Sequence, residues 1–177
     1  MDITNILLVI SAILFLIVIW STTGIRHFYH LGNLIDKQWN RVNNNLRKRH
    51  DLIPNLIETM RNYKSDSEDI SKSLIKARIK AIKDYCPCMN KVIYEHEIST
   101  LINKIVFLSI VVPSLRKDTN FMELRTEIDG IENKINMETN KYNELIRKYN
   151  RHRNKWYLKP ISYVFGFDLE KIFEFEM

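Results

Sequence analysis

The longest hydrophobic stretch of the chain lies close to its first residue. No charged residue occurs between Ile3 and Ile25, and the run from Ile6 to Trp20 is apolar apart from Ser11. A helix needs about 20 such residues to cross the hydrocarbon core of a bilayer, and a helix satisfies its own backbone hydrogen bonds there. The pattern predicts one transmembrane helix, with Trp20 near a membrane interface.

A cleaved signal peptide is the alternative interpretation of this stretch. It would have a positive start, a shorter apolar run and a small-residue cleavage site. Here the charged side chain near the start is the negative Asp2, and the apolar run is long. We therefore favour a membrane anchor over a signal peptide. Lys and Arg stay on the cytoplasmic side, which predicts an outside N-terminus and a cytoplasmic C-terminal domain. The basic residues after the span are Arg26, Lys37, Arg41, Arg47, Lys48 and Arg49.

Beyond the anchor, apolar residues recur every three or four positions, which is the spacing of helices. The first such stretch runs from Leu31 to Met60 and keeps its phase across Pro54. Proline in a helix interior removes a backbone hydrogen bond, so we expect a kinked but nearly continuous helix. The pattern leaves open whether this helix joins the anchor directly, because Gly24 and Gly32 are possible bends.

Two shorter helices are expected next. Ser65 and Glu68 have the form of a capping box, and the helix they open ends before Pro87. Its predicted inner face consists of Ile70, Leu74, Ala77, Ala81 and Tyr85. A third helix spans about Val92 to Val112, its apolar run Ile105–Val112 is expected to be buried, and Pro113 ends it.

The last long helix has the clearest pattern. Asp118 or Thr119 can cap it, and a heptad stripe interrupted by Glu138 follows. The stripe consists of Phe121, Leu124, Ile128, Ile131, Ile135, Tyr142, Leu145 and Tyr149. Together the helices predict an all-α fold: an N-terminal transmembrane helix, then an antiparallel, four-helix-bundle-like arrangement. We divide the chain into an anchor (1–27), a helical bundle (28–155) and an aromatic-rich tail (156–177).

The tail allows two interpretations. Its aromatic residues can fold back over the end of the bundle, or they can form an exposed patch that meets a membrane or a partner. The chain has a formal net charge of +6, with Lys and Arg spread along every helix. The basic cluster after the span sets topology or faces anionic lipid headgroups; nucleic-acid binding is not expected, because no nucleic-acid-binding motif accompanies the charge.

No group of residues indicates a catalytic, cofactor or metal site. Two pairs give an alternative hypothesis of a metal- or redox-dependent protein: His27 with His30, and Cys86 with Cys88. We expect the cysteines to be free thiols in a turn, as is usual in a cytoplasmic domain. The basic block Arg47–Leu56 is interpreted as structural, with its basic residues in solvent, and a docking surface at a kink is the alternative.

The same block resembles the signature of the LemA family. The resemblance includes Trp39, Arg47, Arg49, Asp51, Pro54, Asn55 and Glu58, then Asn120-Phe121, Tyr142-Asn143, Tyr149-Asn150 and Phe165-Gly166-Phe167. It spans about residues 28 to 174. It implies a bacterial membrane protein with one N-terminal span, a cytoplasmic helical bundle and no established molecular activity. These motif residues are therefore structural or docking candidates.

The resemblance also implies a place in the cell. We expect the inner (cytoplasmic) membrane, or, for the magnetosome-associated MamQ branch of the family, the magnetosome membrane. The segment around Cys86 departs from the family, which usually has an Ala-rich stretch there. We expect a non-enzymatic scaffold whose partners are the lipid bilayer, anionic headgroups, and other proteins or further copies of itself.

Overall fold

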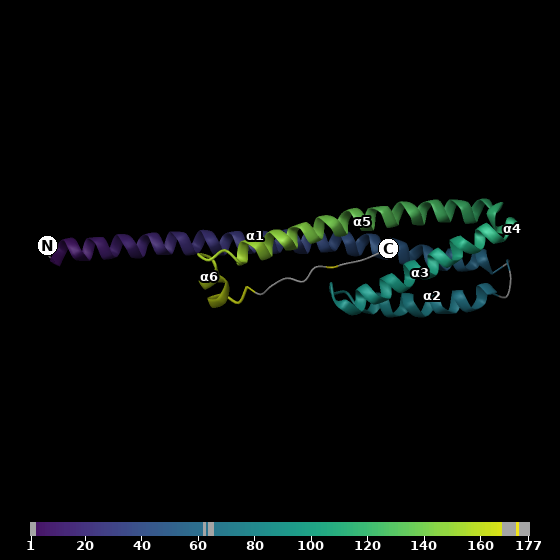
Figure 1. Ribbon diagram of the computed structural model, residues 1–177, viewed down its shortest axis with the longest axis horizontal. Coiled ribbons are helices and arrows are strands. Elements are labelled where there is room, and N and C mark those ends of the chain that lie inside the picture. Colours follow the sequence, from purple (N-terminus) through teal and green to yellow (C-terminus); the bar gives the residue numbers. More distant parts are fainter. Residues whose placement is uncertain (1–2, 62, 64–65, 168–172, 174–177) are drawn as a thin grey trace. The chain divides into compact units, whose positions relative to one another are not determined.

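The fold, taken from a computed structural model, is all-α as predicted (Figure 1). The structure describes residues 3–61, 63, 66–167 and 173, with nothing of the side chains of 66 and 67. Within these ranges it contains six helices and no strand. The helices are α1 (Ile3–Met60), α2 (Asp66–Lys83), α3 (Met89–Val111), α4 (Pro113–Arg116), α5 (Thr119–Arg153) and α6 (Lys159–Val164).

Helix α1 is a single helix of 58 residues that contains Pro54 in its interior. The predicted continuity across Pro54 is confirmed. The helix also passes through Gly24 and Gly32, so the apolar stretch is joined directly to the rest of α1. Its apolar part has a mean hydropathy of 2.7 over an 18-residue window, none of which is buried. The helix is long and apolar enough to cross a membrane.

The described residues group into two compact units. We call residues 38–143 with Phe173 the bundle unit, and residues 3–37 with 144–167 the anchor unit. Helices α1 and α5 contribute to both. The domain limits expected at residues 27 and 155 stay a prediction.

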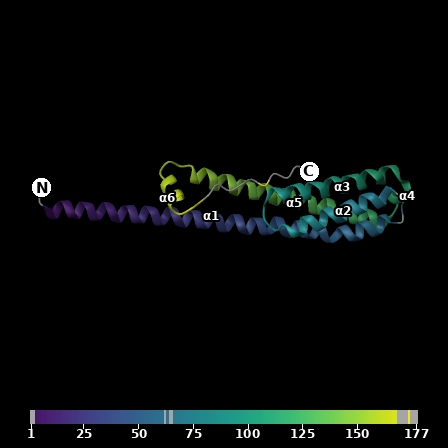
Figure 2. The same cartoon turned by 90° about the horizontal axis from the view of Figure 1, so that it is seen from below.

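The bundle unit packs the second half of α1, helices α2 and α3, and the first part of α5 in alternating directions (Figures 1 and 2). Each helix turns its apolar stripe inward, and each fully buried Leu or Ile contributes about 1.5–3 kcal/mol. The core contains Ile53, Leu56, Met60, Leu74, Ala77, Ala81, Ile98, Leu101, Ile102, Ile105, Leu115, Phe121 and Ile128.

Two expected helix ends are confirmed by local geometry. The backbone N–H of Phe121 donates to Asp118 Oδ1 over 3.2 Å, so Asp118 caps α5. Helix α3 ends at Val111 because Val112 is extended before Pro113, and Pro113 then starts the short α4. The capping box expected at Ser65 lies outside the described residues.

Two other expectations are wrong. Tyr85 lies beyond the end of α2 and is exposed, because that helix stops at Lys83. The Ile105–Val112 run is only partly buried: Phe107, Ile110 and Val111 face solvent. Helix α3 carries apolar residues around its whole circumference there, and the bundle covers one side.

In the anchor unit, aromatic rings join α1 to the end of α5 and to the tail. Phe28 is buried and lies edge-on to Tyr149, at a centroid distance of 5.7 Å. The ring of Phe167 stacks on Phe28 at 4.7 Å. Gly166 has a φ of 68° and lets the chain reverse after α6, so that the Phe167 N–H donates to the Ser162 carbonyl. This explains a glycine at that motif position.

The side chain of Asn143 holds Phe173 in the bundle unit. Its Nδ2 donates to the Phe173 carbonyl over 2.8 Å, and its Oδ1 accepts from the Phe173 N–H over 3.0 Å. We expect Asn143→Ala to lower the free energy of unfolding by about 1–3 kcal/mol, because two buried hydrogen bonds are lost. Chemical denaturation of the full chain in detergent, followed by circular dichroism, measures this. Asn140→Ala, at an exposed position of the same helix, is the control, and equal stability of both variants would contradict the assignment.

Candidate functional site

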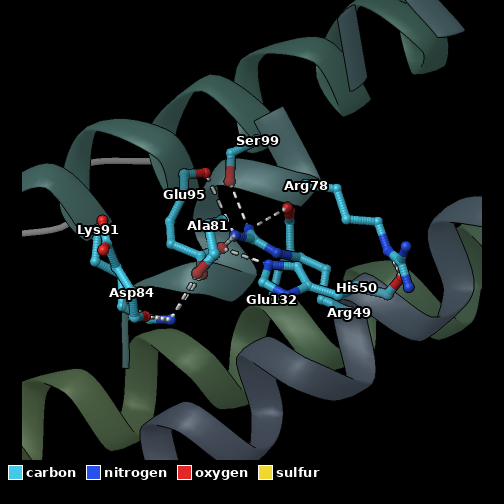
Figure 3. A network of polar contacts seen from close by, with 9 residues as sticks. All are labelled: Arg49, His50, Arg78, Ala81, Asp84, Lys91, Glu95, Ser99 and Glu132. Carbon is cyan, nitrogen blue, oxygen red and sulfur yellow. Dashed lines mark hydrogen bonds and ion pairs between the residues drawn. The ribbon is translucent and has the colours of Figure 1, made fainter. Parts of the chain in front are cut away.

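The most unusual chemistry in the structure is a network of charged side chains inside the bundle unit (Figure 3). Arg49 and Glu95 are completely buried, and His50 and Lys91 are nearly so. Their positions follow from helical spacing. Arg49 continues the stripe of Val42, Leu46 and Ile53 on α1. On α3, Lys91 and Glu95 continue the stripe of Ile98, Ile102 and Ile105, so charged groups and apolar groups share one inward face.

Arg49 is the centre of this network. Its Nη2 lies 2.6 Å from Glu95 Oε2, and its Nη1 donates to Ser99 Oγ over 2.6 Å. A longer ion pair of 3.4 Å joins Nη1 to Glu132 Oε1 on α5. One guanidinium thus connects α1, α3 and α5. His50 Nε2 lies 3.0 Å from the same Glu95 oxygen that Arg49 contacts.

Lys91 closes the network at the α2–α3 connection. Its Nζ donates to the Asp84 carbonyl over 2.7 Å and to the Ala81 carbonyl over 3.2 Å. The same nitrogen is 3.6 Å from Glu95 Oε1. These carbonyls belong to the last turn of α2 and the residue after it, where helical carbonyls have no partner of their own. Lys91 therefore caps α2 and neutralises Glu95.

Burial and charge act in opposite directions on these groups. Burial raises the pKa of Glu95, but the hydrogen bond from His50 and the charge of Arg49 outweigh it and bring the pKa to about 2. Burial lowers the pKa of Lys91, and the charge of Glu95 opposes this. Burial also raises the pKa of Glu132, against the charge of Arg49. Glu95 is therefore an ionised carboxylate at neutral pH.

A small cavity of about 260 Å³, lined mostly by polar and charged residues, adjoins the network. His50 and Asn43 line it, and neither His50 Nδ1 nor Asn43 Nδ2 has a hydrogen-bond partner among the described protein atoms. A cavity of this size holds several water molecules, which can satisfy both atoms. The charges of Arg49, Glu95 and Lys91 are engaged with one another. The arrangement is that of a structural ionic network, and it offers no activated nucleophile.

Apart from Arg49 in the buried network, the predicted motif residues are distributed over three places. Trp39, Tyr142 and Asn143 meet in the bundle unit: the Trp39 ring lies 5.0 Å from Phe173, and its Nε1 donates to the Tyr85 carbonyl. In the anchor unit, Tyr149 and Phe167 both contact Phe28, Gly166 directly precedes Phe167, and Asn150 is partly buried on α5.

The third group, except the buried Phe121, lies on the surface of the bundle unit. Asn55, Glu58 and Asn120 line a shallow surface depression of about 460 Å³, and Phe121 is buried. Pro54 and Asp51 are exposed, and the Arg47 guanidinium lies 5.4 Å from the centroid of the Tyr85 ring. The structure therefore does not bring the motif residues together into one site.

The comparison with protein families agrees with these positions. The LemA family model matches residues 38–177. The chain belongs to the LemA family. No curated protein matches it. In this LemA-family protein the match covers the whole bundle unit, including both partners of the Arg49–Glu95 pair.

One expectation about the basic motif block is wrong. Arg47 and Lys48 are exposed as expected, but Arg49 and His50 are buried. The reason is that both face α3, where Glu95 compensates the charge of Arg49. Sequence reasoning missed Glu95, Lys91 and Ser99. One sequence pattern could have revealed them. Lys91 and Glu95 are four residues apart and lie in phase with the isoleucines of the same helix.

The cysteine expectation is also corrected. Cys86 and Cys88 form a disulfide rather than two free thiols, since the turn at Pro87 brings their Cα atoms to 5.2 Å. His27 lies against His152, with ring centroids 4.1 Å apart. Within the described ranges, no three His, Cys, Asp or Glu residues are placed to hold a metal ion.

The buried ion pair gives a prediction about stability. Glu95→Gln removes the carboxylate closest to a buried guanidinium, which costs about 3 kcal/mol. Glu97→Gln changes an exposed glutamate on the same helix and is the matched control. Denaturation of the full chain in detergent measures both. Indistinguishable midpoints for the two variants would show that Glu95 does not compensate Arg49.

The same carboxylate gives a prediction about pH. Because the pKa of Glu95 falls from 4.5 to about 2 in the folded state, its contribution is complete above pH 4.5 and disappears as the pH falls towards 2. We expect the free energy of unfolding of the wild type to decrease over this interval. Glu95→Gln should show a smaller decrease than the wild type and than Glu97→Gln, in denaturation curves recorded at several pH values.

Proposed function

We propose that this protein is a non-enzymatic, membrane-anchored scaffold that binds an amphipathic helix of a partner protein on α2. Three exposed isoleucines on that helix carry the proposal. Ile75, Ile79 and Ile82 are 44%, 49% and 52% exposed and follow one another at i, i+4 and i+7. This is the spacing with which one helix recognises another. The opposite face of α2 already packs in the core, so the stripe is additional to what folding needs.

A groove next to the stripe supports the same interpretation. It has a volume of about 900 Å³ and lies between α1 and α2 of the bundle unit. Ile53, Ile57 and Ile75 supply its apolar lining, and the motif residues Pro54 and Glu58 border it. The remaining lining residues are Arg61, Glu68, Ser71, Lys72 and Arg78. An apolar groove with charged edges fits the apolar face of a helix.

The charge of α2 indicates which kind of partner helix would bind there. Between Lys72 and Lys83 the α2 sequence has five basic residues and no acidic one. They are Lys72, Lys76, Arg78, Lys80 and Lys83. A partner helix with acidic residues beside its apolar face complements this charge, which favours association and correct register. The partner is therefore expected to be an acidic amphipathic helix.

The proposal includes a location at the inner membrane of a bacterium, with the bundle in the cytoplasm. The basic residues that follow the span support this orientation. The Cys86–Cys88 disulfide argues against a cytoplasmic bundle, because cytosolic proteins rarely keep disulfides. We give the flanking charge more weight, since a single turn brings these two cysteines together. Magnetosome membrane association, as in the MamQ branch, and metal or redox chemistry stay alternative hypotheses.

Site-specific photo-crosslinking tests the proposal. A photoreactive phenylalanine analogue at position 79 of the full chain is expected to crosslink in cells to one protein, through a segment with i, i+4, i+7 apolar residues and acidic neighbours. The same analogue at Glu97 is the control. Ile75→Ser with Ile82→Ser should abolish the adduct and lower the free energy of unfolding by no more than about 1 kcal/mol, because each substitution at an exposed position costs about 0.5 kcal/mol or less.

Three results would contradict the proposal. One is an absence of any protein adduct at position 79. Another is an adduct that survives the double serine variant. The third is a crosslink to a second copy of this chain, which would replace the partner protein by self-association.

A further inference from the structure

A patch of exposed aromatic and aliphatic side chains lies on the anchor unit. Trp156 and Tyr163 are 84% and 88% exposed, and Val164 and Phe165 are exposed beside them. We call Trp156, Tyr163, Val164 and Phe165 the interfacial patch. The other side of the same segment is well packed, with Leu158, Ile161 and Ser162 buried. The segment is thus ordered against the protein by one face and presents large apolar groups on the other.

The position of α6 follows from its contact with α1. An ideal Cβ at Gly24 would lie 3.0 Å from Ile161 Cδ1 and 3.2 Å from Leu158 Cδ2. A larger residue at position 24 would push these two side chains away. Glycine therefore allows α6 to pack directly on α1, and both views show the two helices side by side (Figures 1 and 2).

Gly24 lies at the end of the apolar stretch. The uncharged run Ile3–Ile25 is about 34 Å long as a helix, and the hydrocarbon core is about 30 Å thick. If the run spans the bilayer, Gly24 lies at the level where acyl chains give way to headgroups. Segment 156–165 is packed at this level, on the side of the membrane that the bundle occupies. Trp and Tyr are the residues that concentrate in this zone.

The charge around the patch fits a negatively charged surface. From Leu145 to Phe167 the chain has six basic residues and no acidic one. They are Arg147, Lys148, Arg151, Arg153, Lys155 and Lys159. Lys155 and Lys159 directly flank the patch and are exposed. Basic residues next to apolar side chains at a membrane surface are attracted to anionic lipids.

We propose that the interfacial patch inserts into the headgroup region of an anionic bilayer and forms a second membrane contact besides the span. This contact is independent of the helix partner proposed for α2. It would fix the rotation of α1 about its axis and the height of α6 in the membrane, since α6 is packed on Gly24. The competing possibility is that another protein covers the patch. Purified protein in vesicles has no such partner, so insertion observed there is due to the lipid.

Tryptophan fluorescence in vesicles tests the proposal. The full chain is reconstituted into vesicles of phosphatidylcholine and phosphatidylglycerol, with Trp20→Phe to remove the tryptophan of the span. Trp39 is buried in the bundle unit and gives a constant background. The Trp156 emission is expected to be blue-shifted and to lose most of its intensity with lipids brominated near the headgroup. Iodide in the aqueous phase should quench it little.

Variants separate this insertion from general effects. Trp20→Phe with Trp156→Phe leaves Trp39 alone and should show almost no quenching by brominated lipid. Lys155→Gln with Lys159→Gln, in the Trp20→Phe background, should weaken the quenching and reduce its dependence on phosphatidylglycerol. Far-ultraviolet circular dichroism confirms that each variant is folded. A Trp156 emission typical of water and quenched by iodide, or one shielded from both quenchers, would overturn the proposal.

Discussion

The ion pair between Arg49 and Glu95 is the interaction on which the bundle depends. Removing both charges from water costs several kcal/mol each, and this cost is recovered only when the guanidinium meets its carboxylate at 2.6 Å. Ser99 and Glu132 bind the same guanidinium, so one relative placement of α1, α3 and α5 satisfies it. A slip of one turn in any of these helices would leave a charge buried without compensation. We infer that the network specifies the register of helices whose apolar stripes alone would allow several.

The charges of the network are used for structure. The buried ionisable groups are tied to one another, and Glu95 is held ionised by its partners rather than prepared for proton transfer. The surfaces that we propose for binding lie outside this network. The α2 stripe has a groove and basic neighbours suited to a protein helix, and the interfacial patch has the aromatic side chains suited to lipid. The proposed scaffold role uses these two kinds of surface.

The two Tyr-Asn pairs of the family motif have related roles. Tyr142 and Tyr149 are seven residues apart and lie on one face of α5, so each is directed towards α1. In the bundle unit Tyr142 meets Trp39, on which Phe173 also packs. In the anchor unit Tyr149 meets Phe28, on which Phe167 stacks. The aromatic residues of the tail thus complete clusters that α1 and α5 begin.

The sequence alone determined the apolar stretch, the all-α class, the continuity of the helix across Pro54 and the helix ends at Asp118 and Pro113. These features depend on periodicity, caps and backbone restrictions within a few residues. The turn at Pro87 decided the pairing of the cysteines. The tertiary structure decided the burial of Arg49, its compensation by Glu95 and the exposure of Phe107. Burial of a charge or exposure of an apolar group depends on which other helix lies opposite. That neighbour comes from a distant part of the chain, and the local pattern does not identify it.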